Sequence, residues 1–321
     1  MSAVEIVVVD IGGTYARFAL ARVETGRVVS LGAAVVMKTA DHAGLAGAWH
    51  AFARDTGRPL PRRAAIAVAC PVGTGVLKLT NNPWTIQPGL LPAELGVDRY
   101  VLVNDFGAVG HAVAQLGPEH LAYVAGPGGD LPEEGIISVI GPGTGLGVAQ
   151  VVRRGGRCLI VECEGSHTGF APLDEVDDLL LRRLRRRFGR VSAERVVSGA
   201  GLLALYETLA EMEGRSVAPM DDKAMWDLAV SGRDPLAEAA LERFCMSFGA
   251  VAGDMALAHG ASAVVLAGGL GLRVADRLGA SGFARCFVAK GRMEGLMRSI
   301  PVRLISHPQP GLYGAAAAFG G

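Results

Sequence analysis

The 321-residue sequence has no formal net charge, few lysines and few cysteines, and each of these features argues against a class of protein. The 31 basic and 31 acidic residues cancel, so no polyanion-binding surface over the whole molecule is implied. The sequence has only four lysines, and none of its glycine-rich segments ends in Gly-Lys-Ser or Gly-Lys-Thr. The absence of this motif excludes a P-loop. The five cysteines include no Cys-x-x-Cys pair and are odd in number, which indicates free thiols in a reducing compartment.

Long apolar runs and a basic leader are also missing. No uninterrupted apolar run approaches the ~18 residues that span a bilayer. The opening segment, MSAVEIVVVD, has no basic region and reaches Glu5, which argues against a signal peptide. We therefore expect a cytoplasmic protein without a membrane partner. Half of the residues are apolar, which is enough for a sizeable core, and the length favours two domains at roughly 150 residues each.

Glycine is abundant, at 45 of 321 residues, or about twice the usual ~7%. Two glycine turns share one design. The apolar run Ile6–Val9 leads into Asp-Ile-Gly-Gly-Thr, and apolar residues resume at Ala16. After 130 positions, the run 137–140 leads into Gly-Pro-Gly-Thr-Gly and then into Val148. The pattern predicts two strand–turn–strand units, one opening each half of a duplicated architecture.

Further segments alternate between the apolar pattern of a helix and that of a buried strand. Helical spacing predicts helices over 40–56, 106–116, 174–188, 201–213, 235–259 and 312–319, and buried strands are expected over 64–69, 100–103 and 262–267. This alternation predicts an α/β fold with mixed sheets flanked by helices. The segment 174–188 begins with acids and ends with arginines, as the helix dipole favours. A solvated helix end explains these arginines better than nucleic-acid binding does, so no nucleic-acid partner is expected.

Three glycine turns follow predicted buried strands, at 10–14, 141–147 and 268–269. Such turns bring backbone N–H groups close to a ligand, usually an anion. Taken alone, each turn is explained better by a structural role than by ligand binding, and none has the G-x-G-x-x-G pattern of a dinucleotide site. Together, with Gly-Thr in two of them, they favour a nucleoside triphosphate held between two lobes. Asp10 would then hold the hydration shell of Mg²⁺ beside the phosphates.

The dipeptide Asn104-Asp105 follows the predicted strand at 100–103. A carboxylate on such a rigid mount can accept the proton of a hydroxyl that attacks a phosphoryl group. The dipeptide can also cap the helix that begins near Phe106, and taken alone the pattern favours the cap.

Several segments, in this order and spacing, resemble the bacterial glucokinases of the non-ROK type: DIGGTYARFAL, NDFGAVGHAV, GPGTGLGVA, VSAERVVSGAGL, LAGGL and PGLYGAAAA. The resemblance runs from Val7 to the last predicted helix. That family belongs to the hexokinase–actin–Hsp70 ATPase superfamily. The cysteine-rich zinc signature of ROK kinases is missing from the sequence, which favours the non-ROK branch.

The resemblance implies a two-domain ribonuclease H-like (actin-like ATPase) fold with a cleft between the domains. It implies a small domain of residues 1–109 plus 302–321 and a large domain of 110–301. The implied reaction is transfer of the γ-phosphoryl group of ATP to the 6-hydroxyl of glucose, with Mg²⁺ as cofactor. Relatives are often homodimers, so we expect the same here.

The resemblance also implies a role for individual residues. Asp105 would be the catalytic base. The residues expected to bind ATP and Mg²⁺ are Asp10, which would carry the metal, Ile11, Gly12, Gly13, Thr14, Gly141, Gly143, Thr144, Gly145, Gly268 and Gly269. Those expected to bind the sugar hydroxyls are Asn81, Asn104, Asp105, Glu164, His167 and Glu194. Glu164 and His167 have the spacing of a metal pair, but no third ligand is evident nearby, and Glu162 could compete with Glu164 for its role.

The sequence departs from the family pattern at four positions: Tyr15 replaces the usual asparagine, Gly107 the usual threonine, Ser166 a glycine and Gly169 a common aspartate. These departures leave the preferred hexose open, and fructose, mannose or an amino sugar are alternatives to glucose. A sugar-sensing regulator without catalysis is disfavoured because no DNA-binding segment fits ahead of the first strand and Asp105 is retained. An ATPase acting on another partner is disfavoured by Glu164, His167 and Glu194.

Overall fold

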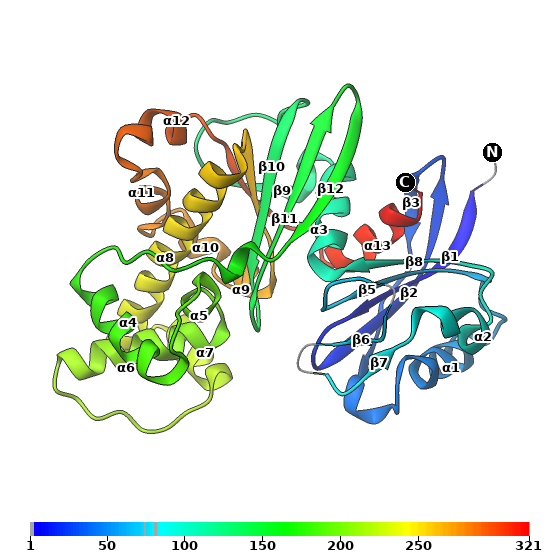
Figure 1. Cartoon of the computed structure of the whole chain (residues 1–321), viewed down its shortest axis with the longest axis horizontal. Coiled ribbons are helices and arrows are strands. Elements are labelled where there is room, and N and C mark those ends of the chain that lie inside the picture. The colour runs from blue at the N-terminus through cyan, green and yellow to red at the C-terminus, as the bar shows by residue number, and fades with distance from the viewer. Residues whose placement is uncertain (1–2, 74, 80–81, 321) are drawn as a thin grey trace. The chain divides into compact units, whose positions relative to one another are not determined.

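The computed structural model describes residues 3–73, 75–79 and 82–320. These residues form two compact units, which are coloured along the chain in Figure 1. Unit 1 comprises Met1–Gly117, Ile160–Glu162 and His307–Gly321, and unit 2 comprises Pro118–Leu159 and Cys163–Ser306. Each unit is built on one sheet with helices packed against it, so the predicted α/β class with mixed sheets is confirmed.

The sheet of unit 1 has the strand order β3-β2-β1-β5-β8, with β4 also paired to β2. Its strands are β1 (Val4–Ile11), β2 (Tyr15–Glu24), β3 (Arg27–Leu31), β4 (Val35–Lys38), β5 (Arg63–Val68) and β8 (Arg99–Asn104). Strand β1 pairs with β2 in an antiparallel hairpin, whereas β1, β5 and β8 run parallel. The predicted first hairpin is therefore confirmed.

Apolar residues cover both faces of this sheet, because successive side chains of β1 point to opposite sides. Val7 and Val9 pack with Trp49 on the face covered by α1 (Leu45–Thr56) and α2 (Leu91–Leu95). Ile6 and Val8 pack on the other face, where α3 (Asp105–Gln115) and the alanine-rich α13 (Pro310–Gly320) lie (Figure 1). A parallel strand that is covered on both faces has a continuous run of apolar residues in its sequence. The segments 6–9 and 64–68 show this pattern.

The sheet of unit 2 repeats this plan in the order β12-β11-β10-β13-β14, with β9 added at the edge. Its strands are β9 (Leu121–Ala125), β10 (Gly135–Pro142), β11 (Leu146–Arg154), β12 (Arg157–Cys163), β13 (Ala263–Leu266) and β14 (Val302–Ile305). Strands β10 and β11 form an antiparallel hairpin, and β10, β13 and β14 run parallel. The second predicted hairpin is confirmed, and it occupies the same place in its sheet as the first.

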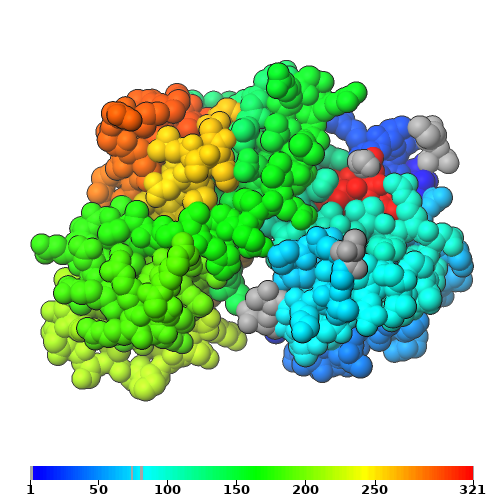
Figure 2. Space-filling view, viewed as in Figure 1, coloured from blue at the N-terminus to red at the C-terminus, as the bar shows by residue number. Residues whose placement is uncertain are grey.

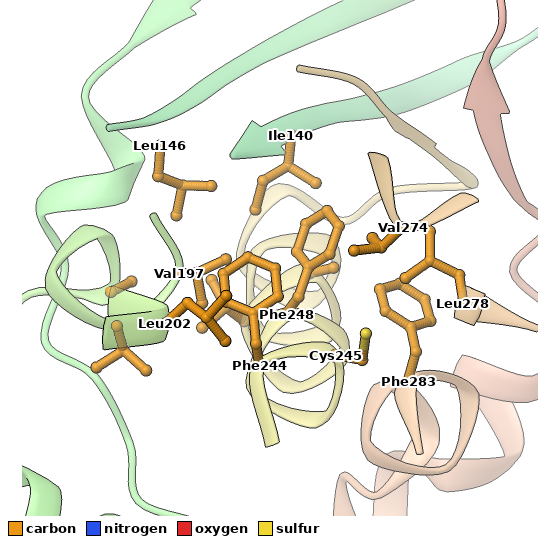
Figure 3. Close-up of a cluster of buried hydrophobic side chains, with 14 of the residues drawn as sticks. Ile140, Leu146, Val197, Leu202, Phe244, Cys245, Phe248, Val274, Leu278 and Phe283 are labelled. Atoms are coloured by element: carbon orange, nitrogen blue, oxygen red, sulfur yellow. The ribbon is translucent and has the colours of Figure 1, made fainter. Parts of the chain in front are cut away.

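Most of the helix lies in unit 2. The longer helices are α4 (Glu175–Phe188), α6 (Gly199–Met212), α7 (Asp222–Ser231) and α8 (Pro235–His259), and the shorter ones are α5 (Ala193–Val196), α9 (Gly269–Arg273), α10 (Ala275–Leu278), α11 (Phe283–Val288) and α12 (Glu294–Arg298). Helix α8 is buried among them, and its Phe244 and Phe248 lie at the centre of the core with Phe283 (Figure 3). In the space-filling view, the segments of α4, α6 and α7 cover the visible lower face of this unit (Figure 2).

Helix ends follow ordinary capping chemistry. The Asp234 side chain accepts a hydrogen bond from the Ala237 N–H, Pro235 opens α8, and Gly260 ends it in the left-handed conformation. The predicted helix 235–259 is confirmed residue for residue. The predicted helix 40–56 was too long, because Thr39–Asp41 forms a separate 3₁₀ turn and Gly44 precedes the first residue of α1.

The remaining short elements are strands β6 (Leu77–Lys78) and β7 (Thr85–Ile86) and the 3₁₀ turns η2 (Pro88–Leu90), η3 (Pro118–His120), η4 (Gly165–His167) and η5 (Gly291–Met293). Across the described ranges, none of the helices combines the length and the hydropathy needed to cross a bilayer.

Candidate active site

The three parallel strands of unit 1, β1, β5 and β8, have their carboxyl ends at the same edge of the sheet. Ile11 of β1 lies opposite Val68 of β5, which in turn lies opposite Asn104 of β8. The turn after β1 and the dipeptide Asn104-Asp105 therefore lie at the same edge of the sheet, with β5 between their strands, although they are far apart in the sequence. The carboxyl edge of parallel strands is where α/β proteins bind ligands.

Asp10 lies near the end of β1, just ahead of the first glycine turn. Its side chain is one-fifth exposed, and its Oδ2 lies 3.7 Å from the Arg17 guanidinium across the hairpin. Burial raises the pKa of Asp10, and the positive charge of Arg17 opposes that rise. Gly311, in the first turn of α13, comes so close that a Cβ there would lie 2.7 Å from Oδ2 of Asp10.

The side chains of Asn104 and Asp105 both accept hydrogen bonds at the start of α3, but to different extents. Asn104 is the N-cap of α3, and its Oδ1 accepts hydrogen bonds from the N–H groups of Phe106, at 2.9 Å, and Gly107, at 3.2 Å. Asp105 is the first residue of the helix, and its Oδ1 accepts from the Phe106 N–H at 2.8 Å. The capping side chain is therefore primarily Asn104, which leaves Asp105 at the positive end of the helix dipole.

Two neighbours fix the backbone around this dipeptide. Asn104 donates through Nδ2 to the Cys70 carbonyl at 3.3 Å, and its own N–H donates to Oε1 of Glu162 at 2.8 Å. The Glu162 carboxylate lies in the space that a Cβ at Gly107 would need. The glycine at position 107 thus makes room for this carboxylate, and Glu162 contacts the start of α3.

In unit 2, the second and third glycine turns meet at the carboxyl ends of β10 and β13. A Cβ at Gly141 would collide with the backbone of Ala267, and one at Gly268 with the carbonyl of Pro142. Gly268 also has a φ of 80°, which favours glycine. The two turns pack backbone against backbone, so the structure brings together two of the predicted nucleotide-binding segments.

The predicted sugar-binding residues of unit 2 come from two adjoining segments. Glu164 precedes turn η4 and His167 is its last residue, with Oε2 and Nε2 3.9 Å apart and both side chains more than half exposed. The Ala193 N–H donates to the Thr168 carbonyl at 2.9 Å, which joins this segment to the one that carries Glu194. Oε2 of Glu194 accepts from the Leu146 N–H at 3.1 Å, so Glu194 also touches the second glycine turn.

Asn81, the remaining predicted sugar-binding residue, lies outside the described residues. Two buried residues that the sequence did not predict, Thr39 and Asn82, hydrogen-bond through their side chains to the carbonyls of the first glycine turn. Neither residue stands in a recognisable motif, so only the three-dimensional contacts identify them.

A cavity of about 430 Å³ lies in unit 2 among β9, α11 and α12. Its lining includes Arg285, Glu294 and Arg298 but none of the predicted site residues. It is therefore separate from the predicted catalytic and binding residues.

The chain offers little that could hold a metal by itself. The described ranges contain no group of three or more His, Cys, Asp or Glu side chains placed to bind an ion. Mg²⁺ commonly keeps several waters and takes one or two carboxylates plus substrate phosphates. A lone, partly buried Asp10 beside a glycine turn fits that requirement, because the phosphates and waters would complete the shell.

Comparison with known proteins places this geometry in a family. A sequence model of the family described as Glucokinase matches residues 7–320. The chain is 56% identical to a glucokinase of Zymomonas mobilis, over 98% of this chain and 97% of that protein. It is 41% identical to a glucokinase of Nitrobacter hamburgensis, with 97% and 95% covered. The crystal structure of a glucokinase from an Antarctic psychrotroph superimposes with a TM-score of 0.84 at 33% identity, covering 98% of each chain. The chain therefore belongs to the glucokinase family, and it is an enzyme.

Proposed function

We propose that Asp105 is the catalytic base of this glucokinase and accepts the proton of the sugar 6-hydroxyl as that oxygen attacks the γ-phosphorus of ATP. The reaction, ATP-dependent phosphorylation of glucose to glucose 6-phosphate, is that of the family to which the chain belongs. The observation that carries the assignment of the base is the shared edge of the unit 1 sheet. At this edge Asp105 opens α3 after β8, and the turn that follows Asp10 lies at the end of β1, with β5 between the two strands.

The chemistry of phosphoryl transfer explains why such a placement is useful. Catalysis depends on aligning the attacking oxygen with the phosphorus and on stabilising the charge of the transferring group. Asp105 is held by its hydrogen bond to the Phe106 N–H, while Asn104 carries most of the capping. Mg²⁺ bound through Asp10 would neutralise charge on the phosphates. The glycine turn 12–14 would contribute backbone N–H groups to the same phosphates.

The residues of unit 2 complete the proposal. Glu164, His167 and Glu194 would bind sugar hydroxyls together with Asn104, since carboxylates, imidazole and amides match several donors and acceptors. Gly141, Gly143, Thr144 and Gly145 would contact phosphates, and Gly268 and Gly269 would flank the adenosine. Asn81 keeps its predicted place among the sugar-binding residues.

We also propose the finer architecture that the resemblance implies, a two-domain ribonuclease H-like (actin-like ATPase) fold with a cleft that closes on the sugar. The repeated strand orders β3-β2-β1-β5-β8 and β12-β11-β10-β13-β14 support it. The domain bounds 1–109 plus 302–321 and 110–301 stay a prediction, although β14 pairs within the sheet of unit 2. A cytoplasmic homodimer also stays a prediction; the five free cysteines suit a reducing compartment.

The direct test is the variant Asp105→Asn. The amide keeps an oxygen for the Phe106 N–H but cannot take up the proton. We therefore expect kcat to fall about 10²- to 10⁴-fold while glucose still binds within about threefold of the wild-type affinity. Steady-state ADP release and calorimetric glucose titration measure the two quantities.

Glu175→Gln is the matched control for this test. Glu175 also opens a helix directly after an acidic or amide N-cap, but it is exposed on α4. We expect its kcat to stay within twofold of wild type. If Asp105→Asn kept a kcat within threefold of wild type, Asp105 would not be the base.

A further inference from the structure

We propose that Thr39, Asn82 and Trp84 act as positioning residues for the nucleotide phosphates, by fixing the peptide planes of the first glycine turn. Together these three residues form what we term the turn bracket. All three side chains are at most 8% exposed. The inference rests on the proposed role of the turn 12–14 in binding the phosphates of ATP.

The turn bracket binds successive carbonyl groups of the turn. Nδ2 of Asn82 donates to the Gly12 carbonyl at 2.9 Å. The Thr39 hydroxyl lies 3.1 Å from the carbonyls of both Gly13 and Thr14, and the Thr39 N–H donates to the Thr14 carbonyl at 3.0 Å. The Tyr15 carbonyl accepts from the Gly12 N–H at 3.0 Å, so four consecutive carbonyls have partners.

Holding these carbonyls also sets the direction of the N–H groups. In a trans peptide the C=O of one residue and the N–H of the next point in opposite directions. With the carbonyls of Gly12 and Gly13 bound on the bracket side, the N–H groups of Gly13 and Thr14 point away from it. An array of N–H groups with one orientation binds anions, whereas a rotated peptide plane would present a carbonyl oxygen and repel the phosphate.

Trp84 supports the other two members of the turn bracket. Its indole N–H lies 3.1 Å from the Thr39 carbonyl and 3.0 Å from that of His42, and its backbone N–H donates to Oδ1 of Asn82 at 2.9 Å. Asn82 is thereby fixed with Nδ2 toward Gly12. The register Tyr15–Lys38 between β2 and β4 places Thr39 beside the turn. The bracket is thus built by two chain segments that carry no predicted site residue in the described ranges.

The central experiment compares Thr39→Val with Thr39→Ser. Valine keeps the shape but removes the hydroxyl, whereas serine retains it. We expect Thr39→Val to weaken binding of ATP and ADP, and to raise the KM for MgATP, by about fivefold to tenfold. Binding of adenosine, which has no phosphates, and the KM for glucose should change less than twofold. Thr39→Ser should recover most of the lost affinity. Calorimetric titration and steady-state ADP release give these values.

Two further variants keep this test decisive. Thr208→Val removes another fully buried hydroxyl bonded to a backbone carbonyl, that of Ala204 in α6, and it should leave the nucleotide parameters unchanged. Asn82→Leu removes the donor to Gly12 and should repeat the selective loss of ATP and ADP affinity if Thr39→Val does not fold.

The outcomes separate the inference from the proposed function. Equal weakening of adenosine, glucose and ATP in Thr39→Val, or unchanged ATP affinity in a folded Thr39→Val, would reduce the bracket to ordinary structural support and overturn the inference. If Asp10→Asn also left kcat and the KM for MgATP within twofold of wild type, the assignment of the phosphate site itself would fail. If Asp10→Asn impaired both while Thr39→Val did not, only the bracket would be wrong.

Discussion

The turns of the two hairpins of this enzyme share the dipeptide Gly-Thr, yet the surrounding structure supports them by different means. In unit 1, the turn after β1 is held by side chains, because Thr39 and Asn82 donate to its carbonyls. In unit 2, the turn after β10 is held mainly by backbone, apart from the Glu194 carboxylate, which accepts from the Leu146 N–H. There Gly141 packs on Ala267, and the Gly143 carbonyl accepts from the Gly199 N–H at 2.9 Å.

This difference shows what a duplicated element does and does not preserve. The strand–glycine–strand geometry is local, so two sequences of similar pattern form it independently. The groups that hold each turn come from other parts of the same unit. The close packing of Gly141 on backbone in unit 2 and the buried Thr39 hydroxyl in unit 1 both hold a turn in place. If the two turns depend on these different supports, substitutions in the two units should differ in the size and kind of their effects.

The largest effect is expected at the backbone contact of unit 2. In Gly141→Ala, the new methyl group would meet the rigid backbone of Ala267, which cannot move aside as a side chain can. We expect the free energy of unfolding to fall by about 3 kcal/mol, as overpacking in a filled site does. Urea denaturation followed by circular dichroism measures it.

Gly143→Ala is the control, because a Cβ at that position in the same turn would meet no atom within 4 Å. Its change should be less than about 1 kcal/mol. Equal stability losses in the two variants would show that the turn of unit 2 does not depend on the close approach at Gly141.

An intermediate effect is expected in unit 1, where Gly311 of α13 approaches the side chain of Asp10 and not backbone. A Cβ at Gly311 would lie 2.7 Å from Oδ2 of Asp10, and the carboxylate can turn away. We expect Gly311→Ala to lower kcat/KM for MgATP by roughly 10- to 100-fold, because Asp10 is displaced from its place beside the turn. The same denaturation assay should show a smaller stability loss than in Gly141→Ala.

Gly295→Ala serves as the control for this variant, since a Cβ on that residue of α12 would meet no atom within 4 Å. Initial rates at varied MgATP measure kcat/KM. A Gly311→Ala enzyme with wild-type kcat/KM would contradict the view that Asp10 needs this close approach.

The smallest effect concerns one partly buried histidine in each unit. Burial lowers the pKa of His111 in α3 and of His259 in α8, whose Nδ1 lies 2.9 Å from the Ser138 hydroxyl. In acid, the unfolded chain therefore binds more protons than the folded one. Stability is full above the unfolded pKa near 6.5 and falls as the pH drops through it toward the lower folded pKa.

Urea midpoints at pH 7.5 and 5.5 measure this loss. His259→Gln and His111→Gln should each reduce the difference between the two midpoints. His50→Gln, on the exposed side of α1, should not. If the variants of His111 and His259 both kept the wild-type difference, carboxylates would have to account for the acid sensitivity.

Much of the fold could be predicted from the sequence, because its signals are local. The two hairpins show as β-branched runs around glycine turns, and α8 shows through Asp234, Pro235 and Gly260 at its ends. Strand β12 was missed, since most of its residues are exposed on an edge and show no clear alternation. Helix α7, with its Asp221 cap, was also missed, because the predicted helices passed over the segment 222–231.

The candidate site divides in the same way. That Asn104-Asp105 and the first turn lie at the same edge of the sheet could be expected, because parallel strands end at one edge. The contribution of Thr39 and Asn82 could not, since it arises from hydrogen bonds across 26 and 70 residues of sequence and from no motif. The space at Gly107 likewise acquires meaning only once Glu162 is seen to fill it.

The most direct test of the proposed reaction is the initial rate of ADP release from MgATP with glucose, compared with fructose, mannose, N-acetylglucosamine and no sugar. We predict turnover with glucose well above that with the other sugars and a negligible rate without sugar. Glucose-independent ADP release, or no release with glucose at saturating MgATP, would contradict the assignment of this chain's reaction.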